Sequence, residues 1–92
     1  MPKITINGTL ICMPDDVEIV AAALPAHIEA SRAEPGCLAF TVTQSGDDPC
    51  VFDVHEVFRD AAALEAHTAR TRASEWWRIT AHIPRDLKVS GT

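Results

Sequence analysis

The chain has 92 residues, of which 47% are hydrophobic and 23% are charged, and its formal net charge is −5. A chain of this length forms one domain, so we expect residues 1–92 to fold as a single unit. The acidic balance and the lack of a basic stripe argue against a nucleic-acid partner. No apolar run approaches the roughly 20 residues that span a bilayer, so we expect no membrane segment.

The chain contains three cysteines, Cys12, Cys37 and Cys50, and no C-x-x-C pair. The N-terminal stretch MPKITING lacks the apolar core of a signal peptide. An odd number of cysteines without a secretion signal favours reduced thiols, so we expect a cytoplasmic protein. Each cysteine lies in a strand-like segment, where a small thiol packs as a hydrophobic side chain.

The first half of the chain predicts a strand followed by a helix. Residues 4–13, ITINGTLICM, are rich in β-branched residues and alternate between an apolar and a mixed face. Pro14, Asp15 and Asp16 then open a helix, because proline and acidic residues suit its positive end. Pro25 should kink or split this helix, since it removes a backbone donor and clashes one turn back. The helix must end by Glu34.

The next segment predicts a β-hairpin. Residues 37–45 and 50–58 alternate in the manner of strands, and GDDP at 46–49 is turn chemistry.

Asp60 is the expected cap of a second long helix. That helix should falter near residues 70–73 and restart with Ser74 as the cap of a short segment containing Trp76 and Trp77. Residues 83–90 form a last, weaker strand.

The order β-α-β-β-α-β predicts an α+β protein with a ferredoxin-like, four-stranded antiparallel sheet covered by helices on one face. The residues expected to face the helices are Ile4, Ile6, Leu10, Leu38, Phe40, Val42, Phe52, Val54 and Phe58. The other face mixes small, polar and apolar side chains, and is too apolar to be comfortable in water. Burial against the same face of a second copy would suit it, so we expect a homodimer.

Several short motifs make the sequence resemble a known family. They are EPGCLAF at 34–40, a DP pair, EVFRD at 56–60, and A-A-x-x-A-H ending at His67. Together they resemble the antibiotic biosynthesis monooxygenase family, including its small quinol monooxygenase-like members. The resemblance implies a dimeric α+β barrel with a cleft between the helices and the sheet of each subunit. Many members are oxygenases that need no metal or organic cofactor, whereas some relatives degrade haem and others have no established activity.

The resemblance also implies site residues. Glu56 matches the acidic residue that closes the third strand of the family, and His67 matches the histidine of its A-H helix motif. Trp76 and Trp77 lie in the aromatic segment that follows, and Asn7 matches a polar position on the first strand. The chain departs from the family at His55, where an aromatic residue is common, and at the segment TRASEWW, so the substrate class stays open.

Two titratable groups are the expected catalytic pair. Glu56 shares the apolar phase of its strand, and His67 lies one turn from Leu64 on the side of its helix that should face the sheet. A histidine poised near neutrality is a suitable general base for a phenolic proton. The alternative is that Glu56 pairs with an arginine to fasten a helix end, the candidates being Arg59, Arg72 and Arg78.

The remaining candidates would bind the substrate. Trp76 and Trp77 point roughly 100° apart on a helix, so only one can point squarely into a cleft. Asn7 falls on the dimer-facing phase, although a bulge at Gly8 could turn it inward. His27 and His55 are interpreted as surface or interface residues. The expected apolar lining is Phe40, Phe52, Phe58 and one tryptophan.

The sequence offers no metal site. His55 and Glu56 are neighbours on a strand and point to opposite faces, so they cannot share one ion. Haem binding would need an accessible histidine, such as His67 or His82, and a large apolar slot. The preferred hypothesis, which the family resemblance implies, is a cofactor-independent oxygenase that acts on a phenolic, quinol or related polycyclic aromatic substrate with O2. The alternatives left open are a barrel that binds a hydrophobic ligand without turnover, and a haem-binding or haem-degrading relative.

Overall fold

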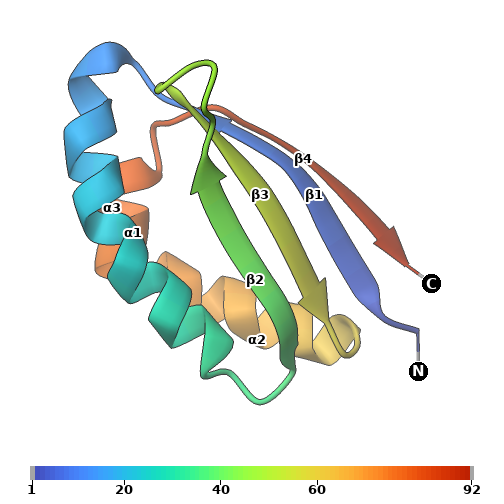
Figure 1. Cartoon of the computed structure of the whole chain (residues 1–92). Coiled ribbons are helices and arrows are strands. Elements are labelled where there is room, and N and C mark those ends of the chain that lie inside the picture. The colour runs from blue at the N-terminus through green and yellow to red at the C-terminus, as the bar shows by residue number, and fades with distance from the viewer. Residues whose placement is uncertain (1, 92) are drawn as a thin grey trace.

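The computed structural model describes residues 2–91 and places all helices on one face of a single sheet (Figure 1). The strands pair in the order β2-β3-β1-β4, with every neighbouring pair antiparallel. The elements are β1 (Ile4–Ile11), the 3-10 turn η1 (Pro14–Asp16), α1 (Val17–Arg32), β2 (Cys37–Gln44), β3 (Val51–Phe58), α2 (Ala61–Arg72), α3 (Glu75–Thr80) and β4 (Arg85–Gly91). This arrangement confirms the predicted ferredoxin-like α+β fold.

The second and third helices begin where the sequence predicts. The Asp60 side chain accepts a hydrogen bond from the backbone N–H of Ala63, which caps α2. The Ser74 hydroxyl accepts one from the N–H of Trp77, which caps α3. These caps satisfy backbone donors that a helix start otherwise leaves unpaired.

The sequence predicts that Pro25 kinks or splits the first helix, and the split does not occur, because α1 runs unbroken from Val17 to Arg32. Pro25 is exposed. On that side the carbonyl that loses its N–H partner can bond to water instead, and the buried face of the helix keeps its packing.

The prediction that Leu38 faces the helices is also wrong. Cys37 pairs with Phe58 and Ala39 with Val57, so the register shifts between Cys37 and Ala39 and Leu38 is the extra residue. A bulge of this kind turns a side chain to the other face. Leu38 is accordingly 52% exposed, while Cys37 packs against the core.

At Gly8 the pairing of β1 shows no bulge, because β1 pairs one to one with both β3 and β4 through this position. The reason for a glycine here is close approach of the neighbouring backbone. A Cβ added to Gly8 would lie 1.9 Å from the carbonyl oxygen of Asp86 in β4. Asn7 therefore keeps its outward direction.

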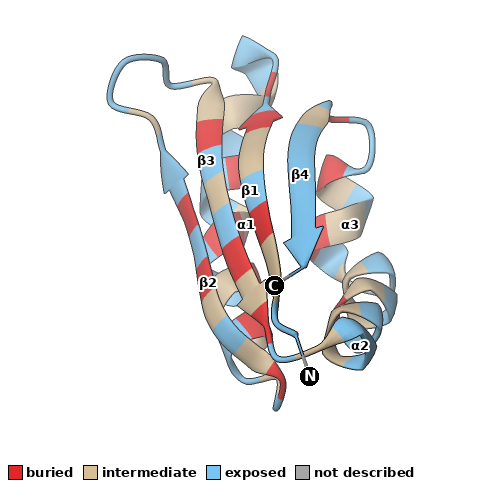
Figure 2. Cartoon of the chain, turned by 90° about the vertical axis from the view of Figure 1, so that its right-hand side faces the viewer, coloured by how far each residue is buried: buried red, intermediate tan, exposed pale blue. Residues whose placement is uncertain are grey.

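The core lies between the sheet and the helices. Phe52 and Phe58 are 1% and 0% exposed, and Val20 of α1 is fully buried. The opposite face of the sheet is covered by no helix and shows a mixture of half-buried and exposed residues (Figure 2). Within residues 2–91, no helix has both the length and the apolar character needed to cross a membrane.

Candidate active site

A cavity of about 230 Å³ lies between the sheet and the helices that cover it. All four strands and all three α-helices contribute to its wall. The lining residues are Ile6, Leu10, His27, Phe40, Val42, Val54, Glu56, Leu64, His67, Thr68, Thr71, Arg72, Trp76, Trp77, Arg85 and Leu87. Most of this wall is apolar or aromatic, and a few polar groups converge on it, which is the usual character of a small-molecule site.

Glu56 and His67 meet in this cavity, as their sequence positions predict. The His67 Nε2 atom lies 3.7 Å from Glu56 Oε1, and the two side chains are 8% and 10% exposed. Glu56 reaches the cavity because its neighbours across the sheet are Ile6 and Phe40, which share its helix-facing side. A carboxyl group between two apolar strands has little water around it.

A second carboxylate holds the imidazole of His67. Glu34 Oε1 lies 2.8 Å from His67 Nδ1, and the other oxygen of Glu34 accepts a hydrogen bond from Arg70 Nε. Arg70 also donates to the hydroxyl of Ser31 over 3.0 Å. Because an ionised carboxylate can only accept, the bond to Glu34 places the His67 proton on Nδ1 and leaves Nε2 as an acceptor, 3.4 Å from the hydroxyl of Thr71, which also lines the cavity.

Burial sets the protonation of both cavity groups near neutral pH. Burial, and then the charge of Glu34, raise the pKa of Glu56 from 4.5 to about 7, although Arg85 acts in the opposite direction. Burial lowers the pKa of His67, an effect that the bond to Glu34 partly offsets. A neutral imidazole therefore faces a carboxyl group that is partly protonated at pH 7.

The arginine partners suggested for Glu56 are engaged elsewhere. Arg59 lies 3.5 Å from Asp60, and Arg78 pairs with Glu75 at 2.8 Å. The guanidinium of Arg72 lies over the ring of Trp77, 5.9 Å from its centroid. Glu56 does not fasten a helix end to any of the three.

The predicted binding residues separate into two groups. Phe40, Trp76 and Trp77 line the cavity. Phe52 and Phe58 are core residues outside the lining, since their strand positions direct them under the helices. Phe58 nevertheless supports the site from behind, because its ring centroid lies 4.8 Å from that of His67.

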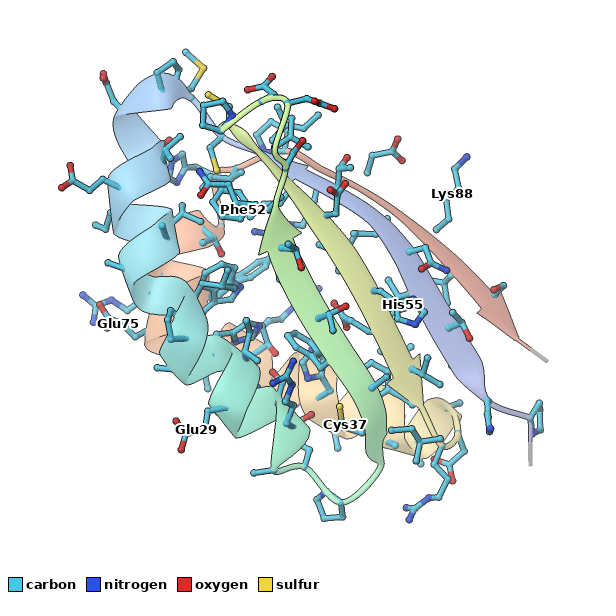
Figure 3. The ribbon with its side chains drawn as sticks, viewed as in Figure 1. Glu29, Cys37, Phe52, His55, Glu75 and Lys88 are labelled. Carbon is cyan, nitrogen blue, oxygen red and sulfur yellow. The ribbon has the colours of Figure 1, made fainter. Side chains whose placement is uncertain are left out.

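Asn7 lies on the other face of the sheet and does not reach the cavity. Its Oδ1 atom is 2.6 Å from Nδ1 of the exposed His55. Figure 3 shows this difference, with Phe52 between the sheet and α1 and His55 on the opposite side. A substrate-binding role for Asn7 inside this cavity is therefore not supported, whereas the interpretation of His55 as a surface residue agrees with its exposure.

Sequence reasoning missed three residues of the site: His27, Glu34 and Arg85. The interpretation of His27 as a surface or interface residue is wrong, because it is 7% exposed and its ring stacks on Trp76 at 4.7 Å between centroids. Its spacing of three from Leu24 and seven from Val20 was a usable signal for the buried face. Glu34 and Arg85 gave no such signal, because they lie at the edges of elements.

The charged groups of the cavity do not form a ligand set for a metal ion. Within the described range 2–91, no three His, Cys, Asp or Glu side chains are arranged to hold one. Arg85 instead donates to the carbonyl of Thr80 over 2.8 Å and lies over Trp77, 5.0 Å from the ring centroid.

Comparison with known proteins agrees with this architecture. The family model described as antibiotic biosynthesis monooxygenase matches residues 4–78. The chain belongs to the antibiotic biosynthesis monooxygenase family. It is also 34% identical over 64 residues to an uncharacterised protein of Synechocystis. That match covers 70% of this chain and 44% of the relative, so the chain spans less than half the length of this curated relative.

Solved structures show the same fold. A protein of Nitrosomonas europaea, named as a candidate antibiotic biosynthesis monooxygenase, is 25% identical with a TM-score of 0.85, over 98% of this chain and 89% of its own. A Pseudomonas aeruginosa protein is 27% identical with a TM-score of 0.75, over 100% and 93% of the two chains. A Bacteroides thetaiotaomicron protein reaches a TM-score of 0.86 over 99% and 98%, and at 21% identity it supports the fold alone.

Proposed function

We propose that this member of the family is a cofactor-independent monooxygenase, and that it oxidises a phenolic, quinol or related polycyclic aromatic substrate with O2. The observation that carries the proposal is the pair formed by Glu34 and His67. A half-buried carboxylate holds the imidazole in one tautomer, and the Nε2 atom, which has the Thr71 hydroxyl at 3.4 Å, lies in the wall of an apolar and aromatic cavity. This is the arrangement of a general base with its orienting group.

The first step is removal of a substrate proton. His67 Nε2 takes the proton of the hydroxyl group, and Glu34 stabilises the imidazolium through Nδ1–H. Glu56, whose pKa is about 7, can donate a hydrogen bond from its protonated form to the new anion. Phe40 and Trp76 offer flat apolar surfaces to an aromatic ring and keep water away from it.

The second step uses O2 as the oxidant and the substrate anion as the source of electrons. An anthrone-type substrate reacts as its enol, in which one of the two methylene hydrogens has become the hydroxyl proton that His67 removes. The former methylene carbon bonds to O2, loses its remaining C–H bond and becomes a carbonyl. One oxygen atom stays in that carbonyl, and the other leaves as water with the remaining hydrogen of the carbon and the proton that His67 returns. The four electrons that reduce O2 come from the substrate, so the protein need only orient the reactants and stabilise charge.

Oxygen uptake with a panel of quinols and anthrones tests this proposal. We expect uptake above the buffer rate with at least one substrate, and roughly 10²–10³-fold slower turnover in His67→Ala, the usual effect of losing a general base. His82→Ala is the matched control, because His82 is exposed and pairs with Asp16 outside the cavity. No uptake with any substrate, or full activity in His67→Ala, would refute the proposal.

We further propose that the protein acts as a homodimer in the cytoplasm. The sheet face that no helix covers carries Ile11, which is 47% exposed and pairs with half-buried Val51, and, at the other end of β3, half-buried Val57. A second copy would remove this apolar surface from water. Cys12, Cys37 and Cys50 are free, which suits a reducing compartment. Light scattering coupled to size-exclusion chromatography tests the association, and a monomer mass at micromolar concentration would contradict it.

A further inference from the structure

His27 is held in one orientation by its aromatic neighbours. Its ring stacks on Trp76 with 6° between the planes and 4.7 Å between centroids. The edge of Phe40 meets it at 79° and 5.3 Å. The same ring lines the cavity and lies 6.1 Å from the ring of His67. A fixed polar ring in a cavity wall is a preorganised group for a ligand.

The two nitrogens of His27 differ in their surroundings. Nδ1 is enclosed by the protein and has no hydrogen-bond partner among residues 2–91. The ring itself lines the cavity, and Nε2 is not enclosed in the way that Nδ1 is. An enclosed N–H without an acceptor is a rare and costly state, so the proton of the neutral ring belongs on Nε2. Burial lowers the pKa of His27 to about 3, which keeps the ring neutral.

Packing alone gives no reason for a histidine at this position. Phenylalanine would keep the stack on Trp76 and the contact with Phe40, and it would leave no buried nitrogen unpaired. The histidine instead adds a donor to a wall in which His67 supplies an acceptor. His67 carries its proton on Nδ1, toward Glu34. The two rings thus offer the same cavity opposite hydrogen-bonding roles.

We propose that His27 is a substrate-binding hydrogen-bond donor, and that the cavity selects phenols with a second oxygen acceptor close to the reacting hydroxyl, such as ortho- or peri-hydroxy ketones. The inference rests on the proposed function, which assigns the hydroxyl to His67. The carbonyl oxygen of such a substrate accepts the Nε2–H of His27. When His67 removes the hydroxyl proton, the negative charge spreads to that oxygen, where the neutral donor stabilises it. The proton moves to His67 and no other bond is broken.

Anaerobic titration calorimetry on the full chain tests the selection without requiring turnover. The probes are 1-hydroxy-2-acetonaphthone, which has a carbonyl beside its hydroxyl, and 1-naphthol, which lacks it. We expect the hydroxy ketone to bind roughly tenfold more tightly, the effect of one added hydrogen bond. His27→Phe should abolish this preference and leave the affinity for 1-naphthol unchanged. His27→Gln should retain it, because the glutamine amide places an N–H near the position of Nε2.

Three results would overturn the inference: no preference in the unsubstituted protein, a preference that survives in His27→Phe, or no binding of either probe. If His27→Phe does not fold, long-range ¹H–¹⁵N correlation spectra of the unsubstituted protein test the inference, because they report which ring nitrogen carries the proton. They should show His27 protonated on Nε2 and His67 on Nδ1, and a proton on Nδ1 of His27 would refute the inference. Oxygen uptake remains a separate readout, so an inactive protein that shows the binding preference refutes only the proposed function.

Discussion

The carboxyl group of Glu56 makes the stability of the fold depend on pH, and Glu56→Gln can isolate its contribution. The pKa of Glu56 rises from 4.5 to about 7 because the side chain is buried near Glu34. A raised pKa means that the folded state favours the protonated carboxyl. With respect to this group, the free energy of unfolding is greatest below pH 4.5, and it falls as the pH rises through 7.

The size of the effect follows from the two pKa values. Each unit of difference between the two pKa values corresponds to about 1.4 kcal/mol. The raised pKa of Glu56 therefore lowers the free energy of unfolding by about 3 kcal/mol at pH 8, and by less than about 1 kcal/mol at pH 5. Glutamine has nearly the same shape and cannot ionise. Glu56→Gln should therefore stabilise the protein by about 3 kcal/mol at pH 8 and change it little at pH 5.

Urea unfolding curves at pH 5, 6.5 and 8 measure this difference. Burial lowers the pKa values of His27 and His67, which weakens the fold of both proteins as the pH falls below 6.5, so the two proteins are compared with each other at each pH. Glu75→Gln is the control, because Glu75 is exposed and pairs with Arg78 at the surface, so its substitution should change the free energy of unfolding by less than about 1 kcal/mol. A Glu56→Gln effect that is constant with pH, or destabilising at pH 8, would refute the burial argument.

Three further outcomes are expected. Glu34→Gln should lower kcat roughly 10²–10⁴-fold with little change in KM, because an amide can donate to Nδ1 and stabilise the wrong tautomer of His67. Glu29 lies on the outer side of α1 in Figure 3, so Glu29→Gln is the control and should keep the kcat of the unsubstituted protein. Equal kcat values in the two variants would contradict the role of Glu34. In steady-state assays, kcat/KM should keep its value as the pH falls below 6.5, because burial lowers the pKa of His67. A decrease in kcat/KM centred at pH 6.5 would argue against a buried base. Gly8→Ala should lower the free energy of unfolding by about 2 kcal/mol or more, because the added Cβ would meet the backbone of β4. Gly46→Ala is the control, because a Cβ at Gly46 would meet open space. Equal urea midpoints for the two variants would contradict the close approach at Gly8.

The parts of the site that could be predicted are those that strand and helix periodicity report. The alternation around Glu56 predicts its helix-facing direction, and the spacing between Leu64 and His67 predicts a shared face, and both residues line the cavity. The same reasoning gave the wrong face for Leu38, because one bulge reverses the phase of the strand before Ala39. The alternation of apolar and polar residues does not indicate where an extra residue is inserted.

Contacts between distant segments could not be predicted in the same way. Glu34 lies 33 residues from His67 in sequence, and only the path of the loop after α1 brings their side chains together. His27 was different, since its helical spacing marked the buried face of α1. Its polar character argued for the surface, and the aromatic neighbours that offset its burial come from β2 and α3.

The central claim is that His67 removes a phenolic proton inside the cavity, and an anaerobic spectrum tests it most directly. Alizarin is a hydroxyanthraquinone whose anion absorbs at longer wavelength than its neutral form, so its spectrum reports the proton. At a pH below its solution pKa, the unsubstituted protein should bind the dye as the anion, and His67→Gln should bind it in the neutral form. A neutral bound dye in the unsubstituted protein, or an anion that persists in His67→Gln, would contradict the account.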